Sequence, residues 1–186
     1  GTVTINDNSS TATRDAAGNW SVGVPAADGG ALTAGDYTIT AALTDKAGNS
    51  NSSTHDVEVN LTVPVLTIDT VSGDDVINNT EKTQDLTISG TATGLAPGAL
   101  VTVMLNGKAY SATVDANGHW TTTVPADQVG ALGEALYDIS ASATDSVGNS
   151  SSTSHTVNVE SVLPGVIINT IAGDDVVNAA EVATGQ

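Results

Sequence analysis

Residues 136–159, LYDISASATDSVGNSSSTSHTVNV, decide the fold, because residues 36–59, DYTITAALTDKAGNSNSSTHDVEV, carry the same pattern one hundred positions earlier. In both stretches, two segments of mixed apolar, Ser and Thr residues flank the sequence Asp-x-x-Gly-Asn. Segments of this composition are typical of β-strands, and the Asp and Gly residues between them favour a tight turn. Each stretch is therefore predicted to be a pair of adjacent strands that a short turn connects.

The repetition covers the whole chain. A shift of one hundred positions aligns residues 1–86 with residues 101–186 in a single register without a gap, which shared composition alone does not produce. Pro64 and Pro164 mark natural boundaries, because proline resists pairing within a sheet. The chain is thus expected to be an excerpt from a longer array. Its expected divisions are the C-terminal part of one repeat, a complete repeat and the N-terminal start of a further repeat, at residues 1–64, 65–164 and 165–186.

The complete repeat contains several short segments of strand-forming residues. Asn106-Gly107 is a strong hairpin signal, because both residues tolerate a positive φ, and a short helical turn is expected near Asn78–Lys82. The predicted strands are residues 65–70, 86–93, 99–105, 108–114, 119–124, 136–144 and 149–159. Seven strands in about 100 residues, with turns at regular spacing, predict an all-β fold of tandem immunoglobulin-like β-sandwich modules.

Two tyrosines support the immunoglobulin-like interpretation. Tyr37 and Tyr137 begin corresponding strands, and each is followed two positions later by an isoleucine. In immunoglobulin-like sandwiches a tyrosine at this place anchors a corner, and the residue two positions further on faces the core. Antibody domains have a cysteine there, but Ile39 and Ile139 replace it in this chain. The core is therefore expected to hold without a disulfide.

Composition excludes several functions. The 186 residues include 4 Lys and Arg, 21 Asp and Glu and no Cys, and the formal net charge is −17. Nucleic acids and anionic membranes need basic patches, and no apolar run reaches the ~18 residues of a membrane span, so we expect neither nucleic-acid binding nor membrane insertion. The missing cysteines exclude disulfides and cysteine-based sites. Because neither a Gly-x-Ser-x-Gly motif nor a phosphate-binding glycine loop is present, we do not expect an enzyme.

Four motifs resemble those of a known family. They are ATVDANGHWTTTVPA at residues 112–126, ATDSVGNSSS at 143–152, TIDTVSGDDVINNTE at 67–81 and LTISGTATG at 86–94. Together they resemble the bacterial Ig-like repeats of giant adhesins that are exported by type I secretion. The resemblance implies a monomeric rod of many modules, secreted or retained at the bacterial cell surface, in which Ca²⁺ ions stiffen the modules and their junctions. It also implies that neighbouring repeats contact one another and that the binding region lies outside them.

An acidic motif recurs at the start of two repeats. Ca²⁺ takes six to eight oxygen ligands, and the motif supplies carboxylate and amide oxygens with little positive charge nearby. Its spacing differs from that of the EF-hand loop. The alternative is that Asp and Asn initiate turns and cap a short helix. The candidate Ca²⁺ ligands are Asp69, Asp74, Asp75, Asn78 and Glu81 in one repeat and Asp174, Asp175, Asn178 and Glu181 in the next, where Asn169 replaces Asp69.

Further aspartates open the predicted turns. Asp45 and Asp145 are candidate Ca²⁺ ligands, because their turn is expected at the end of the sandwich that faces the preceding module, where the first strand begins. Asp145 is therefore expected to approach Asp69, with Ca²⁺ between them. The alternative is ordinary turn chemistry, in which the Asp side chain bonds to the backbone ahead of it. Asp15 and Asp115, which open the turns before each Trp, fit this alternative better.

The Trp and His residues each allow two interpretations. Trp20 and Trp120 follow turns, and an exposed indole could stack on a sugar, so both are candidate glycan-binding residues. We expect a core or lid position instead, because Trp seldom stays fully exposed. His55 and His155 lie in a strand among Ser and Thr residues, and each is expected to be a satisfied surface residue and not a zinc ligand.

Three functions remain. The leading hypothesis is a structural repeat region of a secreted or cell-surface bacterial adhesin, a Ca²⁺-stiffened rod that projects a distal binding region for cell adhesion. Because a charge of −17 opposes compact folding through self-repulsion, the chain is expected to stay loose where Ca²⁺ is scarce. The alternative is that the modules bind host glycans directly through exposed Trp or loop residues. The third is an accessory module of a secreted glycanase, whose catalytic residues must lie on a neighbouring domain.

Overall fold

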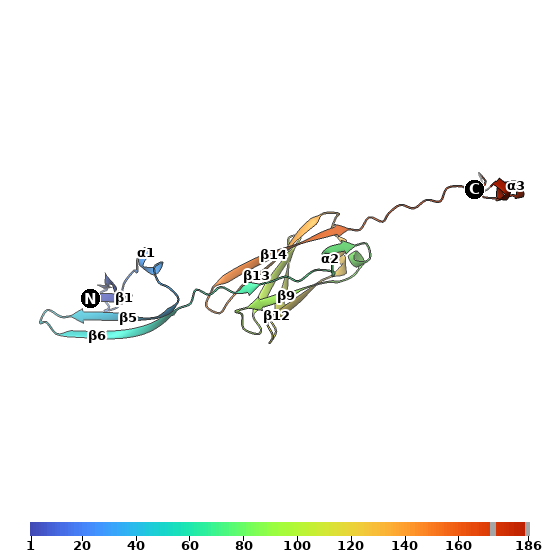
Figure 1. Cartoon of the computed structure of the whole chain (residues 1–186). Helices are drawn as coiled ribbons and strands as arrows, with labels where there is room; N and C mark the ends of the chain where they lie inside the picture. Colours follow the sequence, from blue (N-terminus) through green and yellow to red (C-terminus); the bar gives the residue numbers. More distant parts are fainter. Residues whose placement is uncertain (172–173, 185–186) are drawn as a thin grey trace.

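The structure is a computed structural model that describes residues 1–171 and 174–184. Figure 1 shows an elongated molecule in which two units follow one another and an extended C-terminal segment leaves the second. The first unit contains β1 (Thr2–Ile5), β2 (Asn8–Thr11), β3 (Thr13–Arg14), β4 (Trp20–Ser21), α1 (Ala26–Gly29), β5 (Gly35–Thr44) and β6 (Ser50–Val59).

The second unit follows after a short linker that ends at Pro64. It contains β7 (Val65–Leu66), β8 (Val76–Asn78), the 3-10 helix η1 (Glu81–Thr83), β9 (Leu86–Thr93), β10 (Leu100–Leu105), β11 (Lys108–Thr113), β12 (His119–Val124), α2 (Ala126–Gly130), β13 (Leu136–Thr144) and β14 (Ser150–Glu160). The C-terminal segment carries α3 (Ala179–Thr184). No helix in the described part of the chain is long and apolar enough to cross a membrane.

The second unit is a sandwich of two sheets. One sheet has the strand order β11-β10-β13-β14-β8, and the other has the order β12-β9-β7. Neighbouring strands are antiparallel, except that β8 runs parallel to β14. Because two such sheets with these connections define an immunoglobulin-like sandwich, the structure confirms the predicted fold class.

The core lies between the two sheets. Along β12 the residues alternate between exposed and buried, as expected for a strand with one face on the core. Trp120 is the largest of the fully buried side chains. Others that are completely buried come from both sheets and from α2, and include Ile77, Ile88, Val101, Val103, Val129, Ile139 and Val157.

Gly90 makes room for Trp120. A Cβ atom on Gly90 would lie 1.9 Å from the carbonyl oxygen of Thr67 and 2.6 Å from Cζ2 of Trp120. Without that atom, the indole packs against the β9 backbone, and its Nε1 donates a hydrogen bond to the carbonyl oxygen of Thr91 at 3.1 Å. Trp120 therefore has a position in the core that satisfies both its apolar ring and its polar N–H.

The two tyrosines lie at corners, as predicted. The hydroxyl oxygen of Tyr137 accepts a hydrogen bond from the backbone N–H of Gly133 at 2.9 Å. In the first unit, the Tyr37 hydroxyl lies 3.1 Å from both the backbone nitrogen and the carbonyl oxygen of Thr33. Ile139 is completely buried, which confirms that the residue two positions after the corner faces the core.

The first unit repeats part of the second. Its sheet has the order β2-β1-β5-β6, which corresponds to β11-β10-β13-β14 one hundred residues later. The register is also repeated, because Tyr37 pairs with Val57 as Tyr137 pairs with Val157. The described residues of the first unit include no counterparts of β7, β8 and β9. The inner face of its sheet is therefore only partly covered.

The structure differs from the sequence prediction at three elements. Strand β8 and helix α2 were not predicted, because three or five residues are too short to show a periodicity. Strand β7 covers Val65–Leu66 instead of residues 65–70, although hydrogen bonds from the N–H groups of Thr67 and Asp69 continue its pairing with β9. The remaining predicted strands agree with the structure to within one residue at each end.

Candidate functional site

Asp75 connects the loop before β8 to strand β14. Its Oδ1 accepts a hydrogen bond from the backbone N–H of Val71 at 2.8 Å and lies 2.6 Å from Nε2 of His155. The hydrogen bond from His155, followed by the one from Val71, holds the pKa of Asp75 below its ordinary value of 3.8. His155 was expected to be a surface residue, but it lies half-buried on the inner side of β14.

The other members of this acidic motif form turns and a helix cap. Oδ1 of Asp74 accepts from the N–H of Val76. Oδ1 of Asn78 accepts from the N–H groups of Thr80 and Glu81, and Oε2 of Glu81 accepts in return from the N–H of Asn78. This reciprocal arrangement is that of a capping box, with Asn in place of Ser or Thr.

The same local geometry recurs in the C-terminal segment. Oδ1 of Asp175 accepts from the N–H of Ile171 at 3.0 Å, and Oδ1 of Asp174 accepts from the N–H of Val176. Asn178 and Glu181 repeat the reciprocal bonds of Asn78 and Glu81. The described residues of this segment thus keep the local hydrogen-bond pattern of the acidic motif outside a sandwich.

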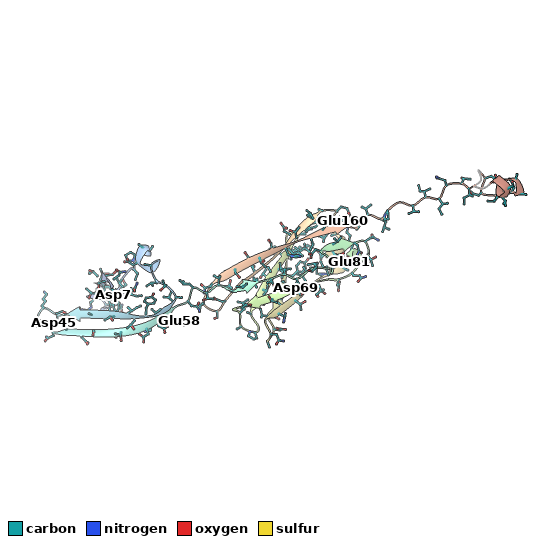
Figure 2. The ribbon with its side chains drawn as sticks, viewed as in Figure 1. Asp7, Asp45, Glu58, Asp69, Glu81 and Glu160 are labelled. Atoms are coloured by element: carbon teal, nitrogen blue, oxygen red, sulfur yellow. The ribbon has the colours of Figure 1, made fainter. Side chains whose placement is uncertain are left out.

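Acidic side chains do not converge into a cluster in the described part of the chain. No group of three or more His, Cys, Asp or Glu side chains there is placed to hold a metal ion. Figure 2 shows labelled acidic residues spread along the molecule, with Asp45 at the outer tip of the first unit and Asp69 beside the body of the second. In this arrangement the residues of the acidic motif initiate turns and cap a short helix, which is the alternative to a Ca²⁺ site.

An oxygen-rich site lies where the turn between β13 and β14 meets the linker. Oδ1 of Asp145 accepts from the N–H groups of Val147 and Asn149, and its Oδ2 lies 3.0 Å from Nδ2 of Asn149. The same Nδ2 lies 3.2 Å from the carbonyl oxygens of both Asn60 and Thr62. One side chain therefore joins the turn of the second unit to the residues that follow the first.

The partner of Asp145 at this junction is not Asp69. Oδ2 of Asp69 accepts a hydrogen bond from Oγ of Ser89 at 2.7 Å, and Asp69 lies along β9 beyond the end that faces the linker. The linker carbonyls of Asn60 and Thr62 take the place that Asp69 was expected to occupy. The described contacts therefore do not join Asp69 to Asp145, because the chain advances along the sheet between Val65 and Asp69.

The ionised form of Asp145 is favoured at the junction. Burial raises the pKa of Asp145, but hydrogen bonds from the side chain and backbone of Asn149 and from Val147 outweigh burial and hold the pKa below 3.8. The side chain is therefore a carboxylate at neutral pH. A carboxylate and two backbone carbonyl oxygens lie around the amide nitrogen of Asn149, and these oxygens are hard donors.

Comparison with protein families identifies the fold family. The model of the family described as "Bacterial Ig-like domain" matches residues 2–70 and 59–161. The chain belongs to this family. A comparison with curated proteins finds no match.

Two solved structures are similar to this bacterial Ig-like chain. One is described as a Ca²⁺-stabilized adhesin that helps an Antarctic bacterium reach out and bind ice, and it is 34% identical with a TM-score of 0.55 over 98% of this chain and 45% of that one. The other, from a study of host cell surface retention of a 1.5-MDa bacterial ice-binding adhesin, is 28% identical with a TM-score of 0.51 over 87% of this chain and 52% of that one. The chain thus spans about half the length of these structures.

The three remaining turn aspartates of the Ig-like units act locally. Asp15 and Asp45 have a lowered pKa, first because of hydrogen bonds from the side chains of Asn19 and Asn49. The pKa of Asp115 is lowered first by the backbone N–H of His119. Each carboxylate thus closes its own turn, and among the described residues the contacts of Asp45 stay within its turn, unlike those at Asp145.

The two tryptophans of the Ig-like units have opposite environments. Trp120 is 2% exposed and belongs to the core, so it presents no ring face to a sugar. Trp20 is 55% exposed within the described residues, which include no strand equivalent to β9 beside it. Of the two candidate glycan-binding residues, Trp120 is therefore the one that the structure places in a core.

Two contacts were not predicted, although the repeat carries both members of each in register. His55 and Asp175 lie one hundred residues from His155 and Asp75, so both members of the pair recur in register. Asn49 and Asn149 also recur, after the turn glycine. The sequence gives no signal for the linker carbonyls, because any residue carries a backbone carbonyl.

Proposed function

We propose that the chain is part of the repeat region of a secreted or cell-surface bacterial adhesin, in which Ig-like modules form a rod that projects a distal binding region for cell adhesion. The observation that carries this proposal is the contact of Asn149 with the linker carbonyls, because it couples consecutive modules end to end. The adhesin structures to which the chain is similar support it. The motifs of the chain also resemble those of giant adhesins exported by type I secretion, such as the Salmonella non-fimbrial adhesin SiiE, and we extend the proposal to this mode of export.

The modules of this rod are assigned from the repeat. Residues 1–64 form the C-terminal part of one Ig-like module, residues 65–164 a complete module and residues 165–186 the start of a further one. Supporting observations are the repeated strand register of β5–β6 and β13–β14 and the repeated acidic turn in the C-terminal segment. Neighbouring modules are therefore the first partners of each module.

We further propose that Ca²⁺ stiffens the junction. Asp145 supplies a carboxylate, and Asn60 and Thr62 supply carbonyl oxygens within reach of the same side chain. If the amide group of Asn149 turns over, its oxygen takes the place of its nitrogen beside those carbonyls, an arrangement that a cation would stabilise. Water would complete the six to eight ligands that Ca²⁺ prefers. The bound ion would hold the linker to the turn of the second unit.

The acidic motif is the second candidate for Ca²⁺ in this proposal. Asp74, Asp75, Asn78 and Glu81 already accept backbone hydrogen bonds. Ca²⁺ would therefore have to compete with these N–H donors for the same oxygens. The junction site is favoured because two of its oxygens are backbone carbonyls, which become available to Ca²⁺ when the Asn149 amide alone turns over.

Thermal unfolding in chelator and in excess Ca²⁺ tests this function. A ligand at about 100 times its dissociation constant stabilises a folded protein by roughly 2.7 kcal/mol, so we expect a clear rise in the melting temperature with Ca²⁺ and a smaller one with Mg²⁺. Asp145→Ala should remove the rise, whereas Asp115→Ala, which alters the same kind of turn away from the junction, should keep it. An equal rise in both variants would rule out the junction as the site.

A surface hollow favours a second candidate function. It has a volume of about 770 Å³ and lies between the loop after β9 and the turn that contains Asp145, with Leu95, Leu100 and Ser151 in its lining. Direct binding of host glycans could use this hollow or the exposed ring of Trp20. A glycan array should then show binding that Leu100→Ala or Trp20→Ala weakens, and an array without binding would remove this candidate.

A further inference from the structure

At its end, strand β14 runs past the tyrosine corner that precedes β13. The N–H of Val159 still donates to a backbone carbonyl, that of Ala135, at 2.9 Å. Two residues before Ala135, the N–H of Gly133 donates to the Tyr137 hydroxyl, so the backbone turns there. The N–H of Ser161 follows that of Val159 by two positions and therefore lies on the same edge of the extended chain. It donates to a side chain instead of a backbone carbonyl.

Glu134 provides the acceptors for Ser161. Its Oε1 and Oε2 lie 3.0 and 3.1 Å from the backbone nitrogen of Ser161, and Oε1 also accepts from the Ser161 hydroxyl. The carboxylate therefore takes both donors of one residue. Because Glu134 stands between Gly133 and Ala135, which the corner and β14 hold, the backbone that carries the carboxylate is fixed.

Lys82 adds a positive charge to this contact. Its half-buried side chain comes from the 3-10 helix η1, and its Nζ donates to Oγ of Ser161 at 3.2 Å. The Ser161 hydroxyl, first of all, and then its N–H and the Lys82 ammonium hold the pKa of Glu134 below its ordinary value of 4.5, against the opposing effect of burial. The carboxylate is therefore ionised at neutral pH. Three segments of the chain thus meet at one serine.

The contact belongs to the second unit and is not a common feature of the repeat. The tyrosine corner itself recurs, since the Tyr37 hydroxyl lies 3.1 Å from the backbone nitrogen of Thr33. The three positions one hundred residues away carry no carboxylate, ammonium or hydroxyl group, and are occupied by Ala34, Leu61 and Val182. The side chains that hold Ser161 are therefore an addition to a shared corner.

We propose that Glu134 and Lys82 form a clamp on Ser161 that fixes the direction in which the chain leaves the second unit, and that this clamp needs no metal ion. The Lys82 ammonium provides the positive charge beside the carboxylate that a bound cation would otherwise provide. The two ends of the second unit are thus held in different ways. At one end the Asn149 side chain binds the linker that enters, and at the other the Glu134 side chain binds the segment that leaves.

The clamp is expected to act on local order and only weakly on global stability. Contacts between exposed charged groups contribute little to the free energy of unfolding, and Glu134 is exposed. Because the clamp involves the second unit alone, it is independent of the proposed adhesin function and of Ca²⁺ binding. Order parameters of backbone N–H groups measure local motion directly, with values of about 0.85 for rigid backbone and below about 0.6 for flexible backbone.

Nuclear magnetic relaxation of ¹⁵N in the full chain tests the clamp. We expect order parameters of about 0.85 at Ser161 and Val162 in the presence of a chelator. Glu134→Ala should lower both to below about 0.6, whereas Glu160→Ala should not, because the Glu160 carboxylate bonds to Asn158 within β14. Unchanged amide shifts in β9 and β12 will show that the sandwich of each variant is intact. Order parameters that stay high in Glu134→Ala, or that are already low in the unsubstituted chain with chelator, would overturn the proposal.

Variants of Lys82 test the role of the positive charge. Lys82→Met keeps a long apolar side chain in the half-buried position and removes the ammonium group, so the order parameter of Ser161 should fall. Lys82→Arg keeps the charge and several N–H donors and should restore the value of the unsubstituted chain. Equal order parameters for these two variants would show that the clamp does not use the charge of Lys82 and would contradict the proposed arrangement.

Discussion

Single aspartates determine the turns of this protein. In the turn before β12, Oδ1 of Asp115 accepts from the N–H groups of Asn117 and His119 at 2.7 and 2.9 Å. Corresponding bonds close the turns at Asp45 and Asp145. Since these bonds need an ionised acceptor to be strong, the turns depend on pH.

Asp115→Asn is expected to lower stability at neutral pH but not in acid. The folded pKa of Asp115 is below 3.8, chiefly because of the His119 N–H. A depressed pKa contributes stability above the unfolded value, and this contribution is lost as the pH falls through the folded value. Urea unfolding followed by circular dichroism should therefore show a lower midpoint for the variant at pH 7, and the difference should shrink below pH 3.8.

Asp127→Asn provides the control for this substitution. It removes the same charge from an exposed position in α2. If its midpoint depended on pH in the same way, general charge repulsion would explain the effect and the turn would not.

Gly90→Ala is expected to lower the free energy of unfolding strongly, although the substitution adds only one methyl group. The added methyl group of Gly90→Ala would overlap the Thr67 carbonyl and the Trp120 ring, and overpacking of this kind costs about 3 kcal/mol. Urea unfolding should show a large drop in midpoint. Gly133→Ala is the control, since its Cβ would meet nothing nearer than 3.8 Å, and an equal drop there would show that backbone freedom, not space, is decisive.

At the scale of elements, the sequence predicts the long strands well and the short ones poorly. The strands β9 to β14 follow from composition, turns and the repeat. Strand β8 does not, because it is three residues long and pairs in parallel with a strand eighty residues away. The same limit applies to the junction. Asp145 was predicted as a candidate Ca²⁺ ligand, but its neighbours, the linker carbonyls of Asn60 and Thr62, were not, because backbone atoms leave no pattern in a sequence.

Ile77→Ala measures how much β8 contributes to the sandwich. Ile77 is completely buried between the sheets, and truncation of a buried isoleucine costs about 2–5 kcal/mol. Val65→Ala, in the two-residue strand β7, should change stability little because Val65 is 60% exposed. Chemical unfolding of both variants provides the comparison, and similar midpoints would mean that β8 is dispensable.

At the scale of the whole molecule, one contact governs how the units are oriented. The Asn149 side chain bonds to Asn60 and Thr62, whereas Asn49, its counterpart at the outer end of the first unit, bonds to Asp45 within its own turn. Few bonds cross the junction, so the default expectation is that the units move relative to each other.

Asn149→Ala should make the chain more flexible without unfolding it. Small-angle X-ray scattering should show a broader distribution of interatomic distances for this variant than for the unsubstituted chain. Asn49→Ala removes the same group at a turn that contacts no linker and should leave the distribution unchanged. If both variants scattered alike, the linker would be held by other contacts.

The parallel pairing of β8 with β14 has a mechanical consequence. The linker before β7 and the segment after β14 leave the sandwich at opposite ends (Figure 1), so tension along the chain pulls these two parallel strands in opposite directions. Their hydrogen bonds, including that from the Asn158 N–H to the Asp75 carbonyl, are then loaded in shear and must break together, whereas bonds pulled apart from one end break one after another. The three-residue strand β8 is thus the one that resists extension.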